Sequence, residues 1–312
     1  MKSSEDHNEH VFTSLKALLR MEHIAKTLSF RKNRQRVKSI LGGKHASKLR
    51  GRGLDFEEVR NYERGDDIRN IDWKVTARTQ VTHSRVYSEE KEKPALIVVD
   101  QSNSMFFGSQ KRMKSVVAAE LAAISAFRIL KEGDRVGGAI FTDHGIDIIY
   151  PKRDRKNILR FLEAIVRRNH ALKQRSANRK FEDSLKEITQ KVRNIVSHDF
   201  LVIIVSDFMR YSPKVVKFLT QISQHNDVIL AKVSDPLERD LPRTNFIAGN
   251  DSKQISIKGK ASQIRKNFQE GYDQELLSFE ASMKKYRIPV IKIDTIRSVD
   301  EQLKEQFGLS RK

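Results

Sequence analysis

The sequence predicts an α/β protein with a doubly wound, mostly parallel sheet and a small N-terminal accessory region. Short, unbroken apolar runs of strand length recur after residue 94, among them residues 95–99, 201–205 and 228–233. Such runs are typical of strands that are buried on both faces. Amphipathic helical patterns separate them, and strands that alternate with helices in this way form βαβ units of a parallel sheet.

The composition limits the class of protein. The chain has 312 residues and no cysteine, which excludes disulfides and thiolate metal sites. Its longest apolar runs are far shorter than the roughly 20 residues of a membrane span. The first ten residues, MKSSEDHNEH, lack the apolar segment of a secretory signal. We therefore expect a cytoplasmic protein.

Positive charge dominates two segments of the chain, whose formal net charge is +20. Residues 1–50 contain 12 Lys and Arg against four acidic residues, and residues 151–193 contain 14 against five. Neither segment is interleaved with aromatic residues as a base-stacking surface would be. Solvated helix faces that attract acidic partners explain this charge, and nucleic-acid binding is the alternative.

We expect four parts: a basic helical arm (1–50), a small accessory unit (51–93), the α/β domain (94–297) and a C-terminal helix (298–312). Within the accessory unit, the pattern predicts a short helix at 56–62 and a strand at 82–87. Within the α/β domain, it predicts strands at 95–99, 135–141, 146–150, 201–205, 228–233 and 289–293, and helices at 111–130, 157–166, 181–196, 215–223 and 261–286. The strands at 135–141 and 146–150 are expected to form a hairpin.

Two predicted strands end in polar residues at the same edge of the sheet. ALIVVDQSNSM places Asp100, Ser102 and Ser104 directly after one strand, and LVIIVSDF ends in Asp207. Ligands of such sheets lie beyond the carboxyl ends of the strands, near the point where the strand order reverses. Carboxylate and hydroxyl oxygens suit Mg²⁺ or Mn²⁺, and no histidine or cysteine stands among them to favour zinc. The four residues therefore form a predicted Mg²⁺ or Mn²⁺ site. Helix capping is the alternative role for them, because Asp and Ser are favoured at helix N-termini.

The order of these motifs resembles that of a known family. VVDQSNSM followed by IVSDF resembles the metal-ion-dependent adhesion site of von Willebrand factor A-like domains. Over residues 40–297 the chain resembles the domain-of-unknown-function 58 (DUF58) family, through GRGLDFEEVRNYERGDDIRNIDWKVTAR, VVDQSNSM, GDRVG, IVSDF and VSDPLERDLP. The resemblance implies a von Willebrand factor A-like, Rossmann-like domain, and magnesium held directly or through water by Asp100, Ser102, Ser104 and Asp207. It also implies association with a MoxR-type AAA+ ATPase.

One ligand of the family's site has no counterpart here. Family members supply a threonine from a Gly-Gly-Thr loop between the two motifs, where this chain has KQRSANRKFEDSL. Aligning Ser184-Leu185 with the family's Ala-Leu places Arg179 at the threonine position. Ser176 or Asn178 would take that place only after a shift of the loop. Arg179 would compete with the cation, or would itself bind a partner's carboxylate.

The motif GDDIRNIDWK is the densest charge cluster of the accessory unit. It contains Asp66, Asp67, Arg69, Asp72 and Trp73, the only tryptophan of the chain. One interpretation is an ion network that holds this unit against the main domain, with Trp73 as its apolar anchor. The other is a partner-binding surface.

These observations favour a non-catalytic, metal-dependent protein-interaction module. By resemblance, its partner is a MoxR-type AAA+ ATPase, for which it would act as adaptor or co-chaperone, or an acidic client protein. A metal-dependent phosphoryl hydrolase is the enzymatic alternative. Aspartyl-phosphate hydrolases need a second aspartate two residues after the first, where this chain has Ser102. No G-x-x-x-x-G-K-[ST] motif is present, so ATP hydrolysis is not expected.

Overall fold

The structure is a computed structural model that describes residues 9–27, 54–89, 93–173, 181–209, 212–249 and 254–307. The chain divides into two compact units. The larger comprises Met1–Gly42 and Lys93–Lys312, and the smaller comprises Gly43–Glu92.

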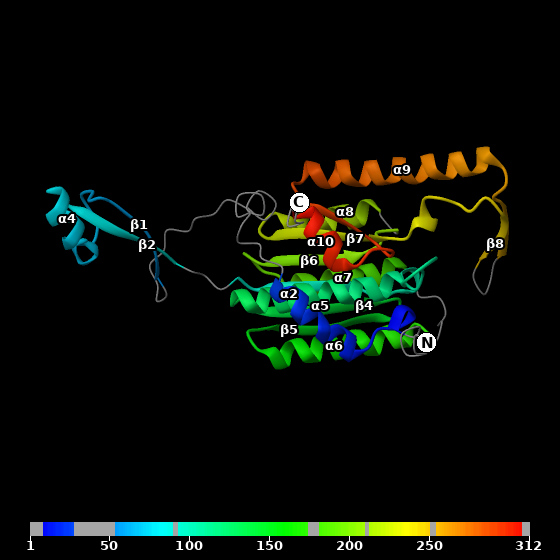
Figure 1. The fold of residues 1–312 in the computed structure, drawn as a ribbon, viewed down its shortest axis with the longest axis horizontal. Helices are drawn as coiled ribbons and strands as arrows, with labels where there is room; N and C mark the ends of the chain where they lie inside the picture. The colour runs from blue at the N-terminus through cyan, green and yellow to red at the C-terminus, as the bar shows by residue number, and fades with distance from the viewer. Residues whose placement is uncertain are drawn as a thin grey trace. The chain divides into compact units, whose positions relative to one another are not determined.

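A six-stranded sheet forms the centre of the larger unit (Figure 1). Its strands are β3 (Ala95–Asp100), β4 (Val136–Thr142), β5 (Gly145–Lys152), β6 (Leu201–Ser206), β7 (Asp227–Ser234) and β10 (Val290–Asp294). They lie in the order β10-β7-β6-β3-β4-β5, and every pair is parallel except β4 with β5. The strand order reverses at β3, because the chain continues to β4 on one side and later returns to β6 on the other. This arrangement confirms the predicted fold class.

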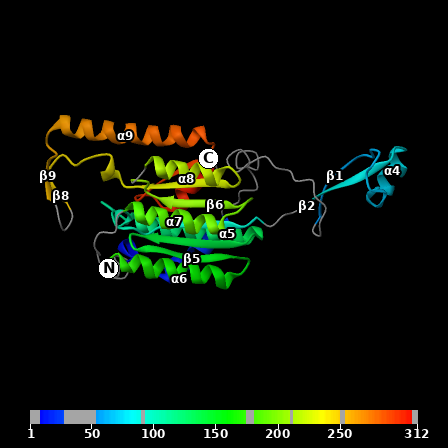
Figure 2. The same ribbon diagram turned by 180° about the vertical axis from the view of Figure 1, so that it is seen from behind.

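Helices cover both faces of the sheet, as the two views in Figures 1 and 2 show. One layer contains α2 (Leu15–Thr27), α5 (Lys114–Glu132), α6 (Arg155–Ala171) and α10 (Val299–Gln306); the other contains α7 (Phe181–Ile195), α8 (Pro213–Ser223) and α9 (Ser262–Lys285). Strand β3 shows why two cores form. Ile97 and Val99 pack into the first layer, whereas Leu96 and Val98 pack into the second. Successive side chains of a strand point to opposite faces, so an unbroken apolar run supplies both cores.

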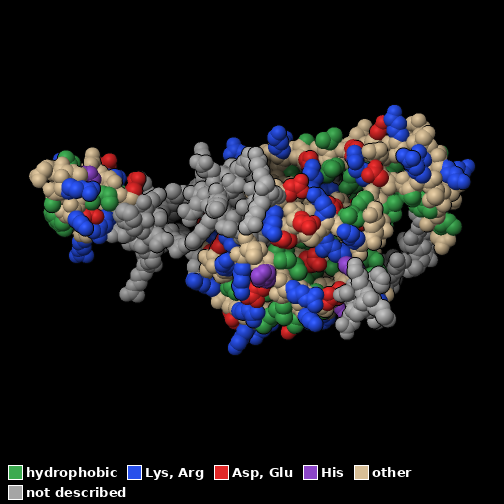
Figure 3. All heavy atoms as spheres, viewed as in Figure 1, with side chains coloured by type: hydrophobic (Ala, Val, Ile, Leu, Met, Phe, Trp, Pro, Cys, Tyr) green, Lys and Arg blue, Asp and Glu red, His purple; other side chains and the backbone are tan. Residues whose placement is uncertain are grey.

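The larger unit also contains a small hairpin outside the central sheet. An antiparallel hairpin of β8 (Asn245–Gly249) and β9 (Gln254–Lys258), which the sequence pattern did not predict, lies between β7 and α9 in the chain. None of the described helices is both long and apolar enough to cross a lipid bilayer. Figure 3 shows basic and acidic side chains interspersed over the visible face of the molecule.

The smaller unit is an antiparallel pair with a short helix. Its elements are β1 (Leu54–Asn61), η2 (Ile68–Asn70), α4 (Trp73–Thr79) and β2 (His83–Glu89). The predicted helix at 56–62 is therefore wrong, and that segment belongs to β1. The register shifts between Phe56 and Glu58, which indicates a β-bulge. The extra residue places Phe56 and Val59 three positions apart, a spacing that imitates a helix.

Candidate functional site

Asp100 and Asp207 lie at the carboxyl ends of two neighbouring strands. Asp100 is the last residue of β3, and Asp207 follows the last residue of β6. The two strands pair directly, up to Val99 with Val205, at the point where the strand order reverses. Both side chains are buried, with Asp100 3% and Asp207 2% exposed. The sheet topology thus brings together two carboxylates that are separated by more than 100 residues.

The loop after β3 adds two hydroxyl groups to this site. It turns into a 3-10 helix, η3 (Asn103–Met105), and places the Oγ atoms of Ser102 and Ser104 3.1 Å apart. Ser102 makes no side-chain capping hydrogen bond, and Ser212, not Asp207, caps α8. The capping alternative therefore does not explain these side chains.

Asp100 accepts two hydrogen bonds. The Ser102 amide donates to Oδ1 over 2.9 Å, and the Ser206 hydroxyl donates to Oδ2 over 2.5 Å. Burial and, secondarily, the negative charge of Asp207 raise the pKa of Asp100 to about 7, although the bonds from Ser102 and Ser206 act in the opposite direction. Burial and the charge of Asp207 both disfavour the ionised form of Asp100, and a cation at this position would stabilise that form.

Lys114 is a site residue that the sequence analysis missed. Its ammonium donates to Asp207 Oδ2 over 2.7 Å and also pairs with Glu238, and the residue is only 1% exposed. Burial acts to lower the pKa of Lys114, but the two carboxylates outweigh burial and hold the pKa above its ordinary value. The helical pattern contained a signal, because Lys114 shares one face of α5 with the buried residues Val117, Ala118 and Leu121.

A second lysine lies beside this pair. The Lys232 ammonium donates to the backbone carbonyl of Asp207 over 2.5 Å. Burial lowers the pKa of Lys232, and the charges of Glu238 and Asp207 offset only part of this effect. A largely buried network of alternating charges therefore forms between α5, the loop after β6, β7 and η4 (Pro236–Glu238). Its members are Lys114, Asp207, Lys232 and Glu238.

Asp235 connects three chain segments next to this network. Its carboxylate accepts hydrogen bonds from the amide and hydroxyl of Ser109, at 2.9 and 2.5 Å, and from the hydroxyl of Thr295 at 2.7 Å. It also caps η4 through the amide of Leu237. Burial would raise the pKa of Asp235, but the hydrogen bonds from Ser109 and Thr295 hold it below its ordinary value.

The four predicted ligands line one small cavity of about 70 Å³. Polar residues form one part of the lining: Asp100, Ser102, Ser104, Ser206 and Asp207. Apolar residues of the sheet, of α7 and α8 and of the loop after β6 form the rest: Val98, Phe141, Leu185, Ile188, Ile204, Phe208, Val215, Phe218 and Leu219. Ser176, Asn178 and Arg179, the residues that bear on the missing threonine, lie outside the described residues.

The predicted partner-binding residues of GDDIRNIDWK lie in the smaller unit. The three aspartates of the motif bind neighbouring residues of the same unit. Asp66 pairs with Arg60 at 2.8 Å, and Asp67 accepts a hydrogen bond from the Arg69 amide at 3.0 Å. Asp72 caps α4 and also pairs with Arg85 at 2.8 Å. Trp73, by contrast, is 69% exposed. Within residues 58–86, only Asp72 and Ser84 are buried. This unit therefore holds its ion pairs at a partly exposed surface and presents its tryptophan to solvent.

Comparison with known families agrees with the order of these motifs. The sequence profile described as "Protein of unknown function DUF58" matches residues 58–276, which include GDDIRNIDWK and all four predicted ligands. The chain belongs to the DUF58 family. An uncharacterized protein of Mycobacterium bovis and one of Mycobacterium tuberculosis are each 27% identical over 221 residues, covering 70% of this chain and 67% of theirs.

Two solved structures are similar to parts of this chain. The conserved hypothetical protein BatB from Bacteroides thetaiotaomicron is 16% identical, with a TM-score of 0.43, over 70% of this chain and all of BatB. A von Willebrand factor type A protein from Catenulispora acidiphila is 15% identical, with a TM-score of 0.29, over 49% of this chain and 35% of that protein. This DUF58 protein is thus similar to these structures over part of its length.

Proposed function

We propose that this DUF58 protein is a non-catalytic interaction module that binds Mg²⁺ and uses the ion to hold a carboxylate of its partner. The main support is the convergence of Asp100, Ser102, Ser104 and Asp207 on one cavity at the switch point of the sheet. Two carboxylates and two hydroxyls are hard oxygen donors of the type that Mg²⁺ prefers. When bound, the ion would supply positive charge and an open coordination position for an acidic side chain.

The hydrogen bonds of the site are compatible with this role. The hydrogen bonds to Asp100 come from Ser102 and Ser206, and an ionised carboxylate has about four lone-pair sites. No group of three or more His, Cys, Asp or Glu side chains that could hold a metal occurs among the described residues. A cation at this cavity would thus depend on the serine hydroxyls. Lys114 already neutralises Asp207, so the ammonium and Mg²⁺ would compete for the same carboxylate.

The proposed partner is a MoxR-type AAA+ ATPase, or an acidic client on which that ATPase acts, with this chain as adaptor or co-chaperone. The family resemblance supports the ATPase. The net charge of +20 supports an acidic partner, because opposite charge accelerates encounter between proteins.

Mg²⁺ is expected to raise the melting temperature of the wild-type protein. A ligand that binds only the folded state stabilises it by about 2.7 kcal/mol at a hundredfold excess over its dissociation constant. Asp100→Asn should abolish this response while the fold survives, whereas Asp199→Asn, at an exposed loop position, should preserve it. Thermal melts with Mg²⁺ and with chelator test this, and identical wild-type melts in both conditions would contradict metal binding.

Association with the ATPase should require both the ion and the serine hydroxyls. Chelation of Mg²⁺, or the double change Ser102→Ala and Ser104→Ala, is expected to weaken binding by about 1–3 orders of magnitude, at about 1.4 kcal/mol per tenfold. Pull-downs with purified ATPase measure the loss.

Binding that survives chelation but is lost in Arg179→Thr would show that Arg179, not a metal, holds the partner's carboxylate. Metal-dependent phosphatase turnover that Asp100→Asn removes would contradict a non-catalytic role.

A further inference from the structure

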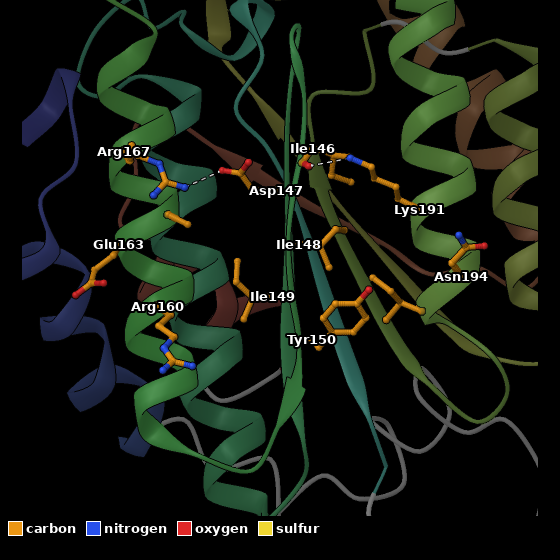
Figure 4. Close-up of a pocket in the computed structure, with 12 residues that line it drawn as sticks. Ile146, Asp147, Ile148, Ile149, Tyr150, Arg160, Glu163, Arg167, Lys191 and Asn194 are labelled. Atoms are coloured by element: carbon orange, nitrogen blue, oxygen red, sulfur yellow. Dashed lines mark hydrogen bonds and ion pairs between the residues drawn. The ribbon is translucent and has the colours of Figure 1, made fainter.

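Strand β5 forms one edge of the six-stranded sheet and has a paired neighbour on one side only within the described part of the chain. A groove of about 650 Å³ lies between α6 and α7 along this strand. Figure 4 shows Arg160, Glu163 and Arg167 of α6 on one side of β5, and Lys191 and Asn194 of α7 on the other. The groove therefore combines an unpaired strand edge with two helical walls.

The backbone of β5 presents hydrogen-bonding groups to this groove. The Gln101 amide donates to the carbonyl of Phe141 over 2.9 Å, so Phe141 of β4 directs its backbone groups toward β3. Its register partner Ile146 therefore directs its own groups away from β4. A contact of 3.5 Å from Lys191 Nζ to the Ile146 carbonyl agrees with this direction. Ile148 presents its N–H and C=O in the same direction, because a strand alternates with a period of two.

The side chains along this edge leave it open to pairing. Natural edge strands are protected by charged residues and proline. In β5 the protective residues are Asp147 near one end and Pro151-Lys152 at the other. The residues between them, Ile148, Ile149 and Tyr150, are uncharged. Tyr150 is 65% exposed.

The groove carries an excess of positive charge. Its lining contains three basic and two acidic residues: Arg160, Arg167 and Lys191 against Asp147 and Glu163. Asp147 is already neutralised by Arg167 at 3.0 Å and by Arg168 at 2.5 Å. Arg160 is exposed and makes no ion pair with any described residue. An occupant of this groove would therefore need negative charge.

We propose that β5 binds an extended, acidic segment of a partner protein as an additional strand. The backbone groups of Ile146 and Ile148 would supply the pairing, and Arg160 with its basic neighbours would select acidic side chains. This surface is separate from the Asp100 cavity and requires no metal. All measurements that test it are therefore made with chelator present, so that failure of the metal proposal does not affect them.

The probe is a fluorescein-labelled ten-residue peptide of alternating glutamate and valine, and binding is followed by fluorescence anisotropy. Arg160→Glu is expected to weaken binding by about tenfold, because it reverses a charge at the groove wall. Arg193→Glu, an exposed change on α7 outside the groove lining, should change affinity by less than about twofold. A peptide with proline in place of valine keeps the charge but cannot pair as a strand, and should not bind.

Hydrogen exchange provides the structural measurement. Bound peptide should slow hydrogen exchange at the amides of Ile146 and Ile148. The exchange rate of the Asp147 amide, which points toward β4, should not change. The proposal is overturned if the peptide fails to bind at millimolar concentration, or if the proline peptide or a lysine–valine peptide binds equally well. It is also overturned if β5 instead pairs with a second copy of the chain, seen as concentration-dependent dimers that Ile148→Pro abolishes.

Discussion

Replacing Lys114 with methionine is expected to lower the free energy of unfolding by about 3–5 kcal/mol. The change removes the only ammonium that pairs with the side chains of both Asp207 and Glu238 among the described residues, and leaves two buried carboxylates without that counter-charge. Removing one partner of a buried ion pair is costly for this reason, even where the intact pair contributes little net stability. Urea denaturation followed by circular dichroism measures the loss. Lys111→Met, an exposed change just before the same helix, should cost less than about 0.5 kcal/mol.

Two companion measurements identify the cause of that loss. Lys114→Met combined with Asp207→Asn should recover part of the stability, because it removes one of the orphaned charges. Mg²⁺ should also stabilise Lys114→Met more than wild type, since the ammonium no longer competes for Asp207. If the double variant is less stable than the sum of the single changes predicts, charge pairing is not the source of the effect.

Asp235→Ala is the second change with a large expected effect, about 3 kcal/mol of lost stability. The carboxylate accepts hydrogen bonds from Ser109, Leu237 and Thr295, which lie in three different segments. Thr295 is buried, and a buried donor that loses its acceptor costs about 1–3 kcal/mol. Ser109 is exposed and Leu237 is half-buried, so their hydrogen bonds contribute less, and donors that share one acceptor do not add fully. Asp235→Asn keeps one acceptor oxygen and should cost less. Asp240→Ala, five residues further on and exposed, is the matched control, and an equal loss in both alanine variants would contradict this account.

The strands of the central sheet and the proximity of the four candidate ligands could be predicted from the sequence because each depends on short segments. An apolar run such as ALIVV is buried on both faces wherever it lies in a parallel sheet. The carboxyl ends of parallel strands meet at one edge, so the proximity of Asp100 and Asp207 follows from the fold class. The order of the strands was not needed for that inference.

The residues that were missed depend on contacts between distant segments. A lysine at the start of a helix is ordinarily exposed, and Lys114 is buried only because Asp207 and Glu238 reach it from 93 and 124 residues away. The segment at 56–62 was assigned to a helix because a β-bulge breaks the alternation of β1, and only its pairing with β2 reveals the strand. In both cases the deciding interaction lies outside the window in which a periodic pattern can be recognised.

The exposure of Trp73 has a spectroscopic consequence. It is the only tryptophan of the chain, and it lies in the unit where residues 58–86 bury Asp72 and Ser84 alone. Intrinsic tryptophan fluorescence therefore originates from an exposed indole that belongs to the smaller unit and to neither apolar core of the sheet. Emission from this protein reports on what contacts Trp73. The cooperative loss of the central sheet is followed instead in the far-ultraviolet circular dichroism of its strands and helices.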